Sequence, residues 1–177
     1  MKILVHMCCG PCAVTFIEGL MGEGVVPDLL WHNPNIHLYI EYQARKKAAE
    51  EFVGLKGLNL VINDNYGLRE FVSAVAHDID SRCDFCYRSR MHYAAKCAAD
   101  NGFEAFSTTL LASPYQNFDT ICRYGFGAAQ EYGVDFVVRD FRSNFRGGLD
   151  IARQMGMYMQ KYCGCVFSEE ERYKNKK

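Results

Sequence analysis

Seven of the nine cysteines in this chain of 177 residues fall into three short groups. Two adjacent cysteines and a Cys-x-x-Cys pair together offer four soft thiolate ligands, which suit a 4Fe-4S cluster. The spacing therefore predicts a metal or redox centre, and it leaves Cys97 and Cys122 as free thiols of the core. The three groups are Cys8-Cys9-Gly10-Pro11-Cys12, Cys83-Asp84-Phe85-Cys86 and Cys163-Gly164-Cys165.

The same thiols have two other interpretations. Four cysteines can form a structural zinc site, although a chain of this length can bury a core without a metal. A thioredoxin-like dithiol explains Cys9 with Cys12, or Cys83 with Cys86, but it leaves the other cysteines without a role. The pattern favours the cluster over both alternatives.

The last two cysteines, Cys163 and Cys165, are separated by a single glycine. A glycine at this position permits the close approach of two sulfurs that is typical of a labile, reducible pair. The pair can also supply two thiolates to a second metal, with Cys12 as the third member, because a cluster needs only four ligands. A surface turn near the C-terminus is the alternative without chemistry.

The charged residues nearly balance, with 20 Lys and Arg against 21 Asp and Glu and a formal net charge of -1. This composition argues against a protein that coats nucleic acid or anionic membrane through bulk charge. Tyr115 and Phe118 can stack on an extruded base, although most aromatic residues belong to cores. Four basic residues ahead of the last cysteines can make surface ion pairs or, near a redox site, hold phosphates. They are Arg142, Arg146, Arg153 and Lys161.

Apolar runs and amphipathic segments alternate along the chain. Such alternation argues for an α/β fold with a parallel sheet and helices on both faces. Ligands of such sheets bind beyond the carboxyl ends of the strands, which places the first cysteine group at the mouth of a site. Strands are expected at 2–7, 25–31, 58–62, 104–109 and 136–138, and helices at 11–21, 41–55, 69–77, 85–99, 118–131 and 151–160.

No repeat, linker or low-complexity tract interrupts the chain, so residues 1–173 are expected to form one catalytic α/β domain. Residues 174–177 are expected to be a disordered basic tail. No apolar run approaches the roughly 20 residues of a membrane span, and His6 interrupts the stretch that a signal peptide would continue. We therefore expect the cytoplasm, where thiols stay reduced unless they bind metal or cycle in catalysis.

Together these residues resemble one family, the cobalamin-independent epoxyqueuosine reductases of the QueH type. The matching segments occur in order over nearly the whole chain, so the resemblance is specific. Gly10 stands where alanine is common in the family, and Leu38 stands where proline is expected. Besides the cysteine groups, the matching segments are Asn33-Pro34-Asn35-Ile36-His37, Glu41-Tyr42, Arg45, Thr108-Thr109-Leu110-Leu111, Ser113-Pro114-Tyr115-Gln116 and Asp140-Phe141-Arg142.

The resemblance implies a Rossmann-like three-layer α/β/α fold of the adenine-nucleotide-hydrolase (HUP) type. It also implies the last step of queuosine synthesis, in which an epoxide at the wobble position of transfer RNA becomes an alkene. The electron donor of that step stays unidentified. The family's cluster ligands match Cys8, Cys9, Cys83 and Cys86, and its redox-active pair matches Cys163 and Cys165. An adjacent mononuclear metal, with iron favoured, would take Cys12 and one or both sulfurs of that pair.

Removing an epoxide oxygen takes two electrons, two protons and a group that stabilises the charge developing on that oxygen. A cluster delivers single electrons, so a Lewis-acidic metal and a dithiol beside it would meet the remaining needs. The expected proton donors are a thiol of Cys163 or Cys165, His37 and Asp84. His37 also fits a hydrogen-bonded loop histidine without a chemical role.

Two other functions stay open at this point. One is a zinc-binding module that binds RNA without catalysis, and the other is an ATP-using enzyme of the same fold superfamily. The turn 7–12 disfavours the ATP-using enzyme, because it holds cysteines where a Ser-Gly-Gly or Gly-x-x-x-x-Gly-Lys phosphate loop would lie.

Overall fold

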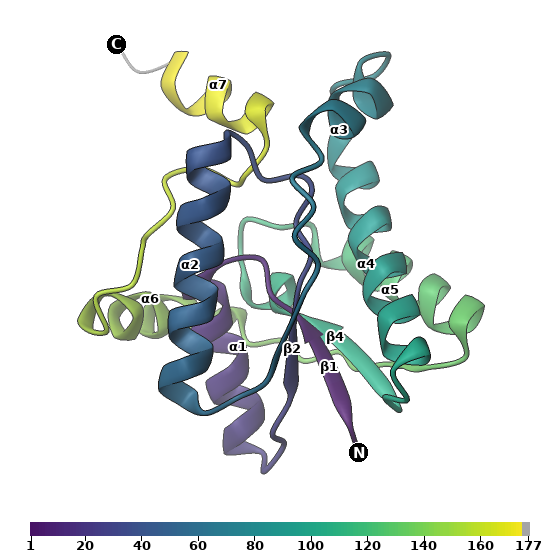
Figure 1. Ribbon diagram of the computed structural model, residues 1–177, viewed down its shortest axis with the longest axis vertical. Helices are drawn as coiled ribbons and strands as arrows, with labels where there is room; N and C mark the ends of the chain where they lie inside the picture. The colour runs from purple at the N-terminus through teal and green to yellow at the C-terminus, as the bar shows by residue number, and fades with distance from the viewer. Residues whose placement is uncertain (175–177) are drawn as a thin grey trace.

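A computed structural model describes residues 1–174 of the chain. A five-stranded parallel sheet lies at its centre, with the strand order β3-β2-β1-β4-β5 (Figure 1). This order reverses between β1 and β4, and ligands of such sheets bind at that point, beyond the carboxyl ends of the strands. The strands are β1 (Ile3–His6), β2 (Asp28–Trp31), β3 (Leu60–Ile62), β4 (Ala105–Thr108) and β5 (Asp135–Phe136).

Helices cover both faces of the sheet (Figure 1). One layer holds α1 (Gly10–Gly22), α2 (Tyr39–Lys56) and α6 (Phe145–Gln154). The other holds α3 (Leu68–Val75), α4 (Arg82–Asp100) and α5 (Phe118–Tyr132). Two short 3-10 turns, Thr109–Ala112 and Arg142–Asn144, follow β4 and precede α6. This arrangement is the Rossmann-like α/β/α fold expected from the sequence.

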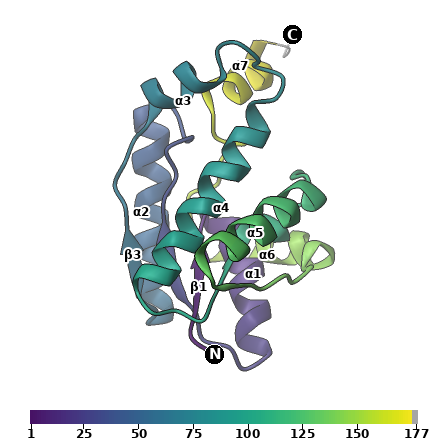
Figure 2. The same ribbon diagram turned by 90° about the vertical axis from the view of Figure 1, so that its right-hand side faces the viewer.

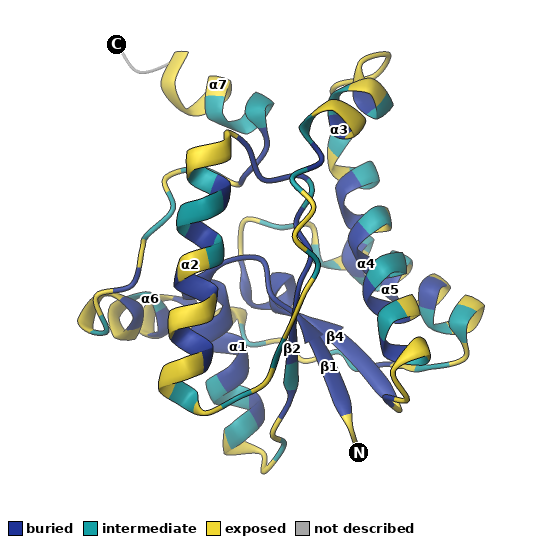
Figure 3. Cartoon of the chain, viewed as in Figure 1, coloured by how far each residue is buried: buried dark blue, intermediate teal, exposed yellow. Residues whose placement is uncertain are grey.

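The central strands are buried over their whole length, and the buried residues gather between the two helical layers (Figure 3). A strand covered by helices on both faces has no polar side to expose, which explains the continuous apolar run of β1. The buried polar side chain of His6 is hydrogen-bonded, with Nδ1 2.9 Å from Thr108 Oγ1 and Nε2 3.1 Å from the His32 carbonyl. His6 pairs with Thr108 in the sheet register, so β1 and β4 end level with each other.

A glycine allows α6 to lie directly against α1. A Cβ atom on Gly148 would lie 2.9 Å from Thr15 Cβ and 3.1 Å from its Cα, so no larger residue fits here without moving the helix. The contact anchors the segment that leads from α6 to the last cysteine group.

The C-terminal part differs from the sequence-based expectation. The predicted helix 151–160 is wrong at both ends, because α6 begins at Phe145 and stops at Gln154, and Gly156 adopts a positive φ of 68°. The chain then runs without regular structure to Cys163 and forms a further helix, α7 (Val166–Lys174). Lys174, expected in a disordered tail, is the last residue of that helix, and the rest of the expected tail lies outside the described residues.

Tertiary contacts explain why α7 forms despite its short length. Figure 2 shows α7 beside α3 at one end of the molecule. The ring of Phe167 lies 6.2 Å from that of Phe71 on α3, and Arg82 at the start of α4 pairs with Glu171 at 2.5 Å. Within residues 1–174, no helix is long and apolar enough to cross a membrane.

Candidate metal and redox site

Three cysteine sulfurs gather where β1 passes into α1. Cys8, Cys9 and Cys12 are buried, their sulfurs all lie within 4.8 Å of one another, and the sulfurs of Cys8 and Cys9 are 3.7 Å apart. Thr109, which follows β4, donates its hydroxyl hydrogen to Cys8 Sγ over 3.4 Å. Gln160 donates from Nε2 to Cys9 Sγ over 2.9 Å. The level ends of β1 and β4 therefore build a buried three-sulfur group that is able to bind a metal ion.

Hydrogen bonds favour the thiolate of Cys8 within this group. Bonds from Cys12 and Cys9, with a further one from Thr109, hold the pKa of Cys8 well below its ordinary value although burial opposes them. The shared bond to Cys8 and burial raise the pKa of Cys12. Without metal, the thiols of Cys9 and Cys12 thus stabilise one thiolate, and a bound metal would displace their protons.

The other four site cysteines form a second neighbourhood. Cys83 and Cys86 lie in the first turns of α4, and the side chains of Cys86 and Cys165 pack in one small apolar cluster with Phe71. Burial, with smaller contributions from Cys165 and Cys163, raises the pKa of Cys86 to about 12. The packing of Cys165 against Cys86 places the C-terminal cysteine pair beside the start of α4.

Two residues of the first half of the chain hold the loop that carries Cys163 and Cys165. Arg45, which is 2% exposed, donates from Nη1 to the Cys163 carbonyl over 2.8 Å. His37 donates its backbone N–H to the Gly164 carbonyl over 2.7 Å and accepts the N–H of Val166 at Nδ1 over 3.3 Å. The peptide bond after His37, to Leu38, is cis. These bonds dock the loop on the carboxyl end of the sheet.

A series of hydrogen bonds links Tyr87, Gln116 and Cys163. Tyr87 donates its hydroxyl hydrogen to Gln116 Oε1 over 2.9 Å and accepts the N–H of Asn117. With its oxygen held in this way, Gln116 donates from Nε2 to Cys163 Sγ over 3.5 Å. The amide of Gln116 is thereby oriented with its donor toward the exposed thiol.

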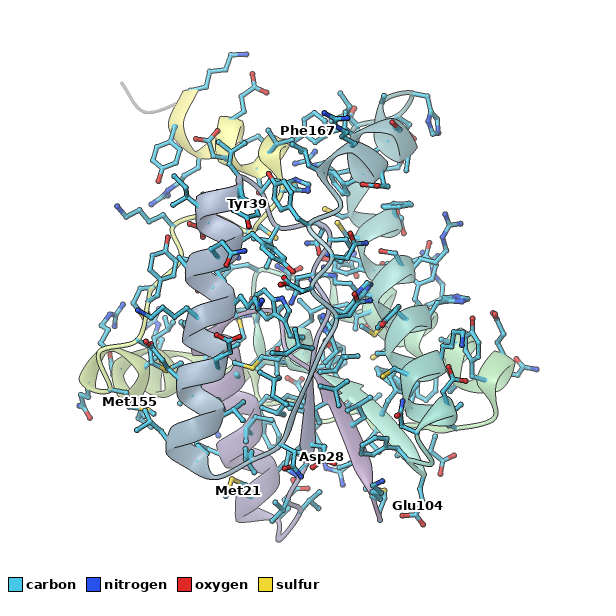
Figure 4. The ribbon with its side chains drawn as sticks, in the orientation of Figure 1. Met21, Asp28, Tyr39, Glu104, Met155 and Phe167 are labelled. Carbon is cyan, nitrogen blue, oxygen red and sulfur yellow. The ribbon has the colours of Figure 1, made fainter. Side chains whose placement is uncertain are left out.

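Figure 4 labels residues at both ends of the sheet. Asp28 and Glu104 mark the end where β2 and β4 begin, and Tyr39 and Phe167 mark the opposite end. The first cysteine group follows the carboxyl end of β1, and Cys86 and Cys165 pack with Phe167. The first group thus lies at the carboxyl end of the sheet, as the sequence predicted.

The two predicted proton donors other than cysteine are both engaged. His37 is completely buried, and its Nε2–H donates to the Pro34 carbonyl over 3.0 Å while Nδ1 accepts from Val166. Burial lowers the pKa of His37, so its neutral form is favoured. Asp84 accepts from Arg123 at 3.0 Å and from the Tyr124 hydroxyl at 3.2 Å. Their assignment as donors stays a prediction.

The predicted basic residues lie on α6 and the segments on either side of it. Arg142 lines a cavity of about 500 Å³ together with Pro114, Asp140 and Ser143. Its guanidinium pairs with Asp140 at 2.6 Å and lies over the ring of Phe118 at 4.3 Å. The other three basic side chains are exposed, and one of them, Arg153, pairs with Asp150.

The family model described as "Epoxyqueuosine reductase QueH" matches residues 3–171. The chain belongs to the epoxyqueuosine reductase QueH family. A QueH protein of Dehalococcoides mccartyi is 34% identical over 97% of this chain and 94% of its own. The QueH protein of Thermotoga maritima is 33% identical over 96% of this chain and 91% of its own. The family assignment made from the sequence is confirmed.

The fold has a counterpart outside the QueH family. A crystal structure of a predicted subunit of tRNA methyltransferase from Methanocaldococcus jannaschii has a TM-score of 0.52 and 12% identity, covering 89% of both chains. A likeness at this identity concerns the fold alone. It agrees with the three-layer α/β/α architecture with a parallel sheet that the sequence of this QueH-family chain predicted.

The donors of this QueH-family chain fit a metal–thiolate centre. Three of its sulfurs already share one buried pocket, and soft thiolates select iron–sulfur clusters, zinc or copper(I) over hard cations. Amides and a hydroxyl donate to the sulfurs of Cys8, Cys9 and Cys163, and such bonds tune iron–sulfur centres. All nine cysteines are free thiols. Cys97 and Cys122 are half-buried and pack against the core.

Several site residues of this QueH-family chain carry no chemical signal in the sequence. Arg45 matches the family pattern and lies one helical turn after its partner Glu41, at 2.6 Å, but neither signal relates it to Cys163. Gln160 and Gln116 are uncharged residues, and nothing in their spacing relates them to a particular cysteine. The structure also groups Cys12 with Cys8 and Cys9, whereas the division of cysteines between two metals stays a prediction.

Proposed function

We propose that this chain reduces epoxyqueuosine at the wobble position of transfer RNA to queuosine, the last step of queuosine synthesis. The reaction removes the epoxide oxygen as water, consumes two electrons and two protons, and leaves a carbon–carbon double bond. The observation that carries the proposal is the gathering of cysteines at the switch point of the sheet in a chain of the QueH family. The electrons must reach this site from an external reductant.

The proposed cluster ligands are Cys8, Cys9, Cys83 and Cys86, and Cys12 with one or both sulfurs of Cys163 and Cys165 would hold an adjacent mononuclear iron. When bound, these groups supply single electrons and a Lewis acid for the epoxide oxygen. Arg45 relates the two cysteine neighbourhoods, since its charge acts on Cys9 while its Nη1 binds the Cys163 carbonyl. Arg45 and His37 keep the Cys163 loop in place.

The geometry favours Cys163 Sγ as a proton donor. Cys163 is exposed, whereas Cys165 is buried and His37 uses both ring nitrogens. The Gln116 amide then stabilises the thiolate that remains on Cys163 after transfer. Cys165 would close the dithiol pair when the two thiols supply electrons.

The basic residues on and around α6 are the proposed contacts to the RNA backbone. Pro114 lines the cavity beside Arg142, and the next residue, Tyr115, is 83% exposed and packs edge-on against Phe145 at 5.8 Å. The exposed ring of Tyr115 can stack on an unpaired base, and the guanidinium of Arg142 can bind a phosphate. A transfer RNA substrate and thiols kept reduced agree with the cytoplasm as the compartment.

Anaerobic purification with iron and sulfide analysis tests the proposal. Brown protein with labile sulfide supports the reductase, colourless protein with zinc supports an RNA-binding zinc module, and stabilisation by nucleotide alone supports an ATP-using enzyme. Serine substitutions at Cys8, Cys9, Cys83 and Cys86 should each remove most of the iron and the visible absorption.

Cys97→Ala and Cys122→Ala serve as matched controls on α4 and α5. Both thiols are half-buried against the core, so each substitution should lower the free energy of unfolding by about 1 kcal/mol and leave the iron content unchanged. Full cluster content in Cys83→Ser or Cys86→Ser would show that the ligand assignment is wrong.

A further inference from the structure

Arg90 on α4 is a buried cation without a carboxylate partner. Its side chain is 4% exposed, and its Nε donates to the Cys86 carbonyl over 3.1 Å. Within residues 1–174, no carboxylate oxygen lies within 4.0 Å of its guanidinium. Arg45, the other deeply buried arginine, has Glu41 at 2.6 Å. The protein therefore provides a counter-charge for one buried arginine and not for the other.

The groups around Arg90 are thiols and neutral side chains. Burial raises the pKa of Cys86 and Cys83 on the same helix, and the charge of Arg90 opposes this rise. The same charge adds to the effect of burial on His6 and His32 at the ends of β1 and β2. Burial and then Arg90 lower the pKa of His6 to about 4. Burial, His6 and Arg90 lower that of His32 to about 3. Both histidines are buried, and the ring of Tyr87 lies 6.0 Å from the guanidinium of Arg90.

A buried charge that lacks a partner is strongly unfavourable, because the interior does not replace the water that it loses. Cys86 and Cys83 lie on the same helix as Arg90, and they carry negative charge once they bind a metal as thiolates. The negative charge of the metal–thiolate centre would then balance the positive charge of Arg90.

We infer that Arg90 is the counter-cation of the metal–thiolate centre and a positioning residue that favours its reduced state. The inference rests on the proposed function, because the centre must exist for Arg90 to act on it. Reduction adds negative charge to the centre, and a neighbouring cation stabilises the more negative state. The net charge and hydrogen bonding around a cluster set its reduction potential.

Anaerobically reconstituted full-length protein tests this inference with Arg90→Met, which keeps the length of the side chain and removes its charge. The ratio of reduced to oxidised centre at a fixed potential should fall about tenfold, equivalent to about 59 mV for a one-electron couple. Arg90→Lys keeps a charge and should stay within about threefold of wild type. Arg88→Met removes a charge from an exposed position of the same helix and should leave the ratio unchanged.

Visible absorption during a redox titration gives the ratio, and iron and sulfide are measured in every sample. An Arg90→Met protein with wild-type iron content and an unchanged ratio of reduced to oxidised centre overturns the inference. The same result combined with weaker RNA binding also overturns it, because the guanidinium would then bind a phosphate of the RNA. If Arg90→Met fails to fold, Arg90→Lys decides, and loss of the centre in that variant overturns the role of charge. Wild-type protein that takes up no iron overturns the proposed function itself.

Discussion

The guanidinium of Arg45 donates a hydrogen bond of 2.8 Å to the backbone carbonyl of Cys163, 118 positions later in the chain. Its second terminal nitrogen binds the carbonyl of Tyr162 at 2.9 Å, and Nε binds Glu41 at 2.6 Å. One buried side chain of α2 thus sets the backbone position of the exposed thiol of the site. Precision at this loop depends on a planar group with donors in fixed directions.

Arg45→Lys keeps the positive charge and loses the planar guanidinium whose nitrogens make these hydrogen bonds. We expect the free energy of unfolding to fall by about 1 to 3 kcal/mol and hydrogen exchange at residues 162–166 to accelerate. Urea unfolding and exchange mass spectrometry measure both. Lys47→Ala, at an exposed position of the same helix, is the control and should change stability by less than about 0.5 kcal/mol. Unchanged exchange at 162–166 would show that other contacts hold the loop.

Joint replacement of Cys163 and Cys165 by alanine should leave folded, brown protein that binds its RNA and converts no epoxide. The four proposed cluster ligands remain, whereas the dithiol or the second metal site is lost. Iron content, RNA binding and single-turnover product formation measure the three properties. Rescue by excess dithionite indicates an electron relay, and failure with loss of one iron per chain indicates a metal site. Turnover at the wild-type rate would show that the pair has no chemical role and belongs to a surface turn.

Binding of the RNA should depend on salt through the basic face. Arg146 and Lys161 have no ion pair within residues 1–174, so their charges are available to phosphates. Replacing both by alanine should weaken binding and lower the slope of log K against log salt by about 1.5. Adding Arg142→Ala and Arg153→Ala should lower it further. Lys47→Ala with Lys96→Ala is the control, and an unchanged slope in the quadruple variant would redirect attention to Arg82 and Arg88.

His32 should make stability depend on pH. Its ring stacks on Tyr93 with centroids 3.6 Å apart, and its buried Nδ1 has no partner in the described part of the chain. The pKa of His32 is about 3 in the folded state and about 6.5 when unfolded, so only the unfolded state binds a proton between these values. Stability is therefore complete above pH 6.5 and is lost as pH falls, by up to about 1.4 kcal/mol per pH unit.

His32→Phe keeps the stacked ring and removes the unpaired nitrogen. The free energy of unfolding at pH 7 should rise by about 1 kcal/mol, and its decrease toward pH 5 should become shallower. His6 leaves a residual slope, since burial and Arg90 lower its pKa to about 4. Urea titrations from pH 5 to 7.5 measure the effect, with His77→Gln at an exposed position as the control. A slope equal to that of wild type would contradict the assignment.

Two glycines of the α1 region should respond differently to alanine. On Gly10 a Cβ would lie 2.6 Å from Met157 Cε, the end of a flexible side chain, so Gly10→Ala should cost less than about 1 kcal/mol. On Gly148 it would meet Thr15 Cα on the backbone at 3.1 Å, so Gly148→Ala should cost about 2 to 3 kcal/mol. Thermal unfolding compares the two. Equal costs would mean that α6 moves freely against α1.

The sequence by itself determined the fold class, the position of the first cysteine group and the family. Periodicity and turn residues act within a few positions, so the alternation of strands and helices can be inferred without knowing what they pack against. The start of α1 at Gly10, after the cysteine turn, follows from Pro11, which is favoured in the first turn of a helix. The spacing of the cysteines indicates a metal or redox centre for the same reason, because the local backbone fixes the relative positions of ligands that are close in sequence.

Only the tertiary structure decided which distant groups meet. The end of α6 at Gln154 and the formation of α7 depend on contacts such as that of Phe167 with Phe71, which sequence periodicity does not contain. The grouping of Cys12 with Cys8 and Cys9 and the bond from Arg45 to Cys163 result from where helices pack on the sheet. The missing carboxylate beside Arg90 is likewise a property of burial, because a charge reveals its lack of a partner only after water has been excluded.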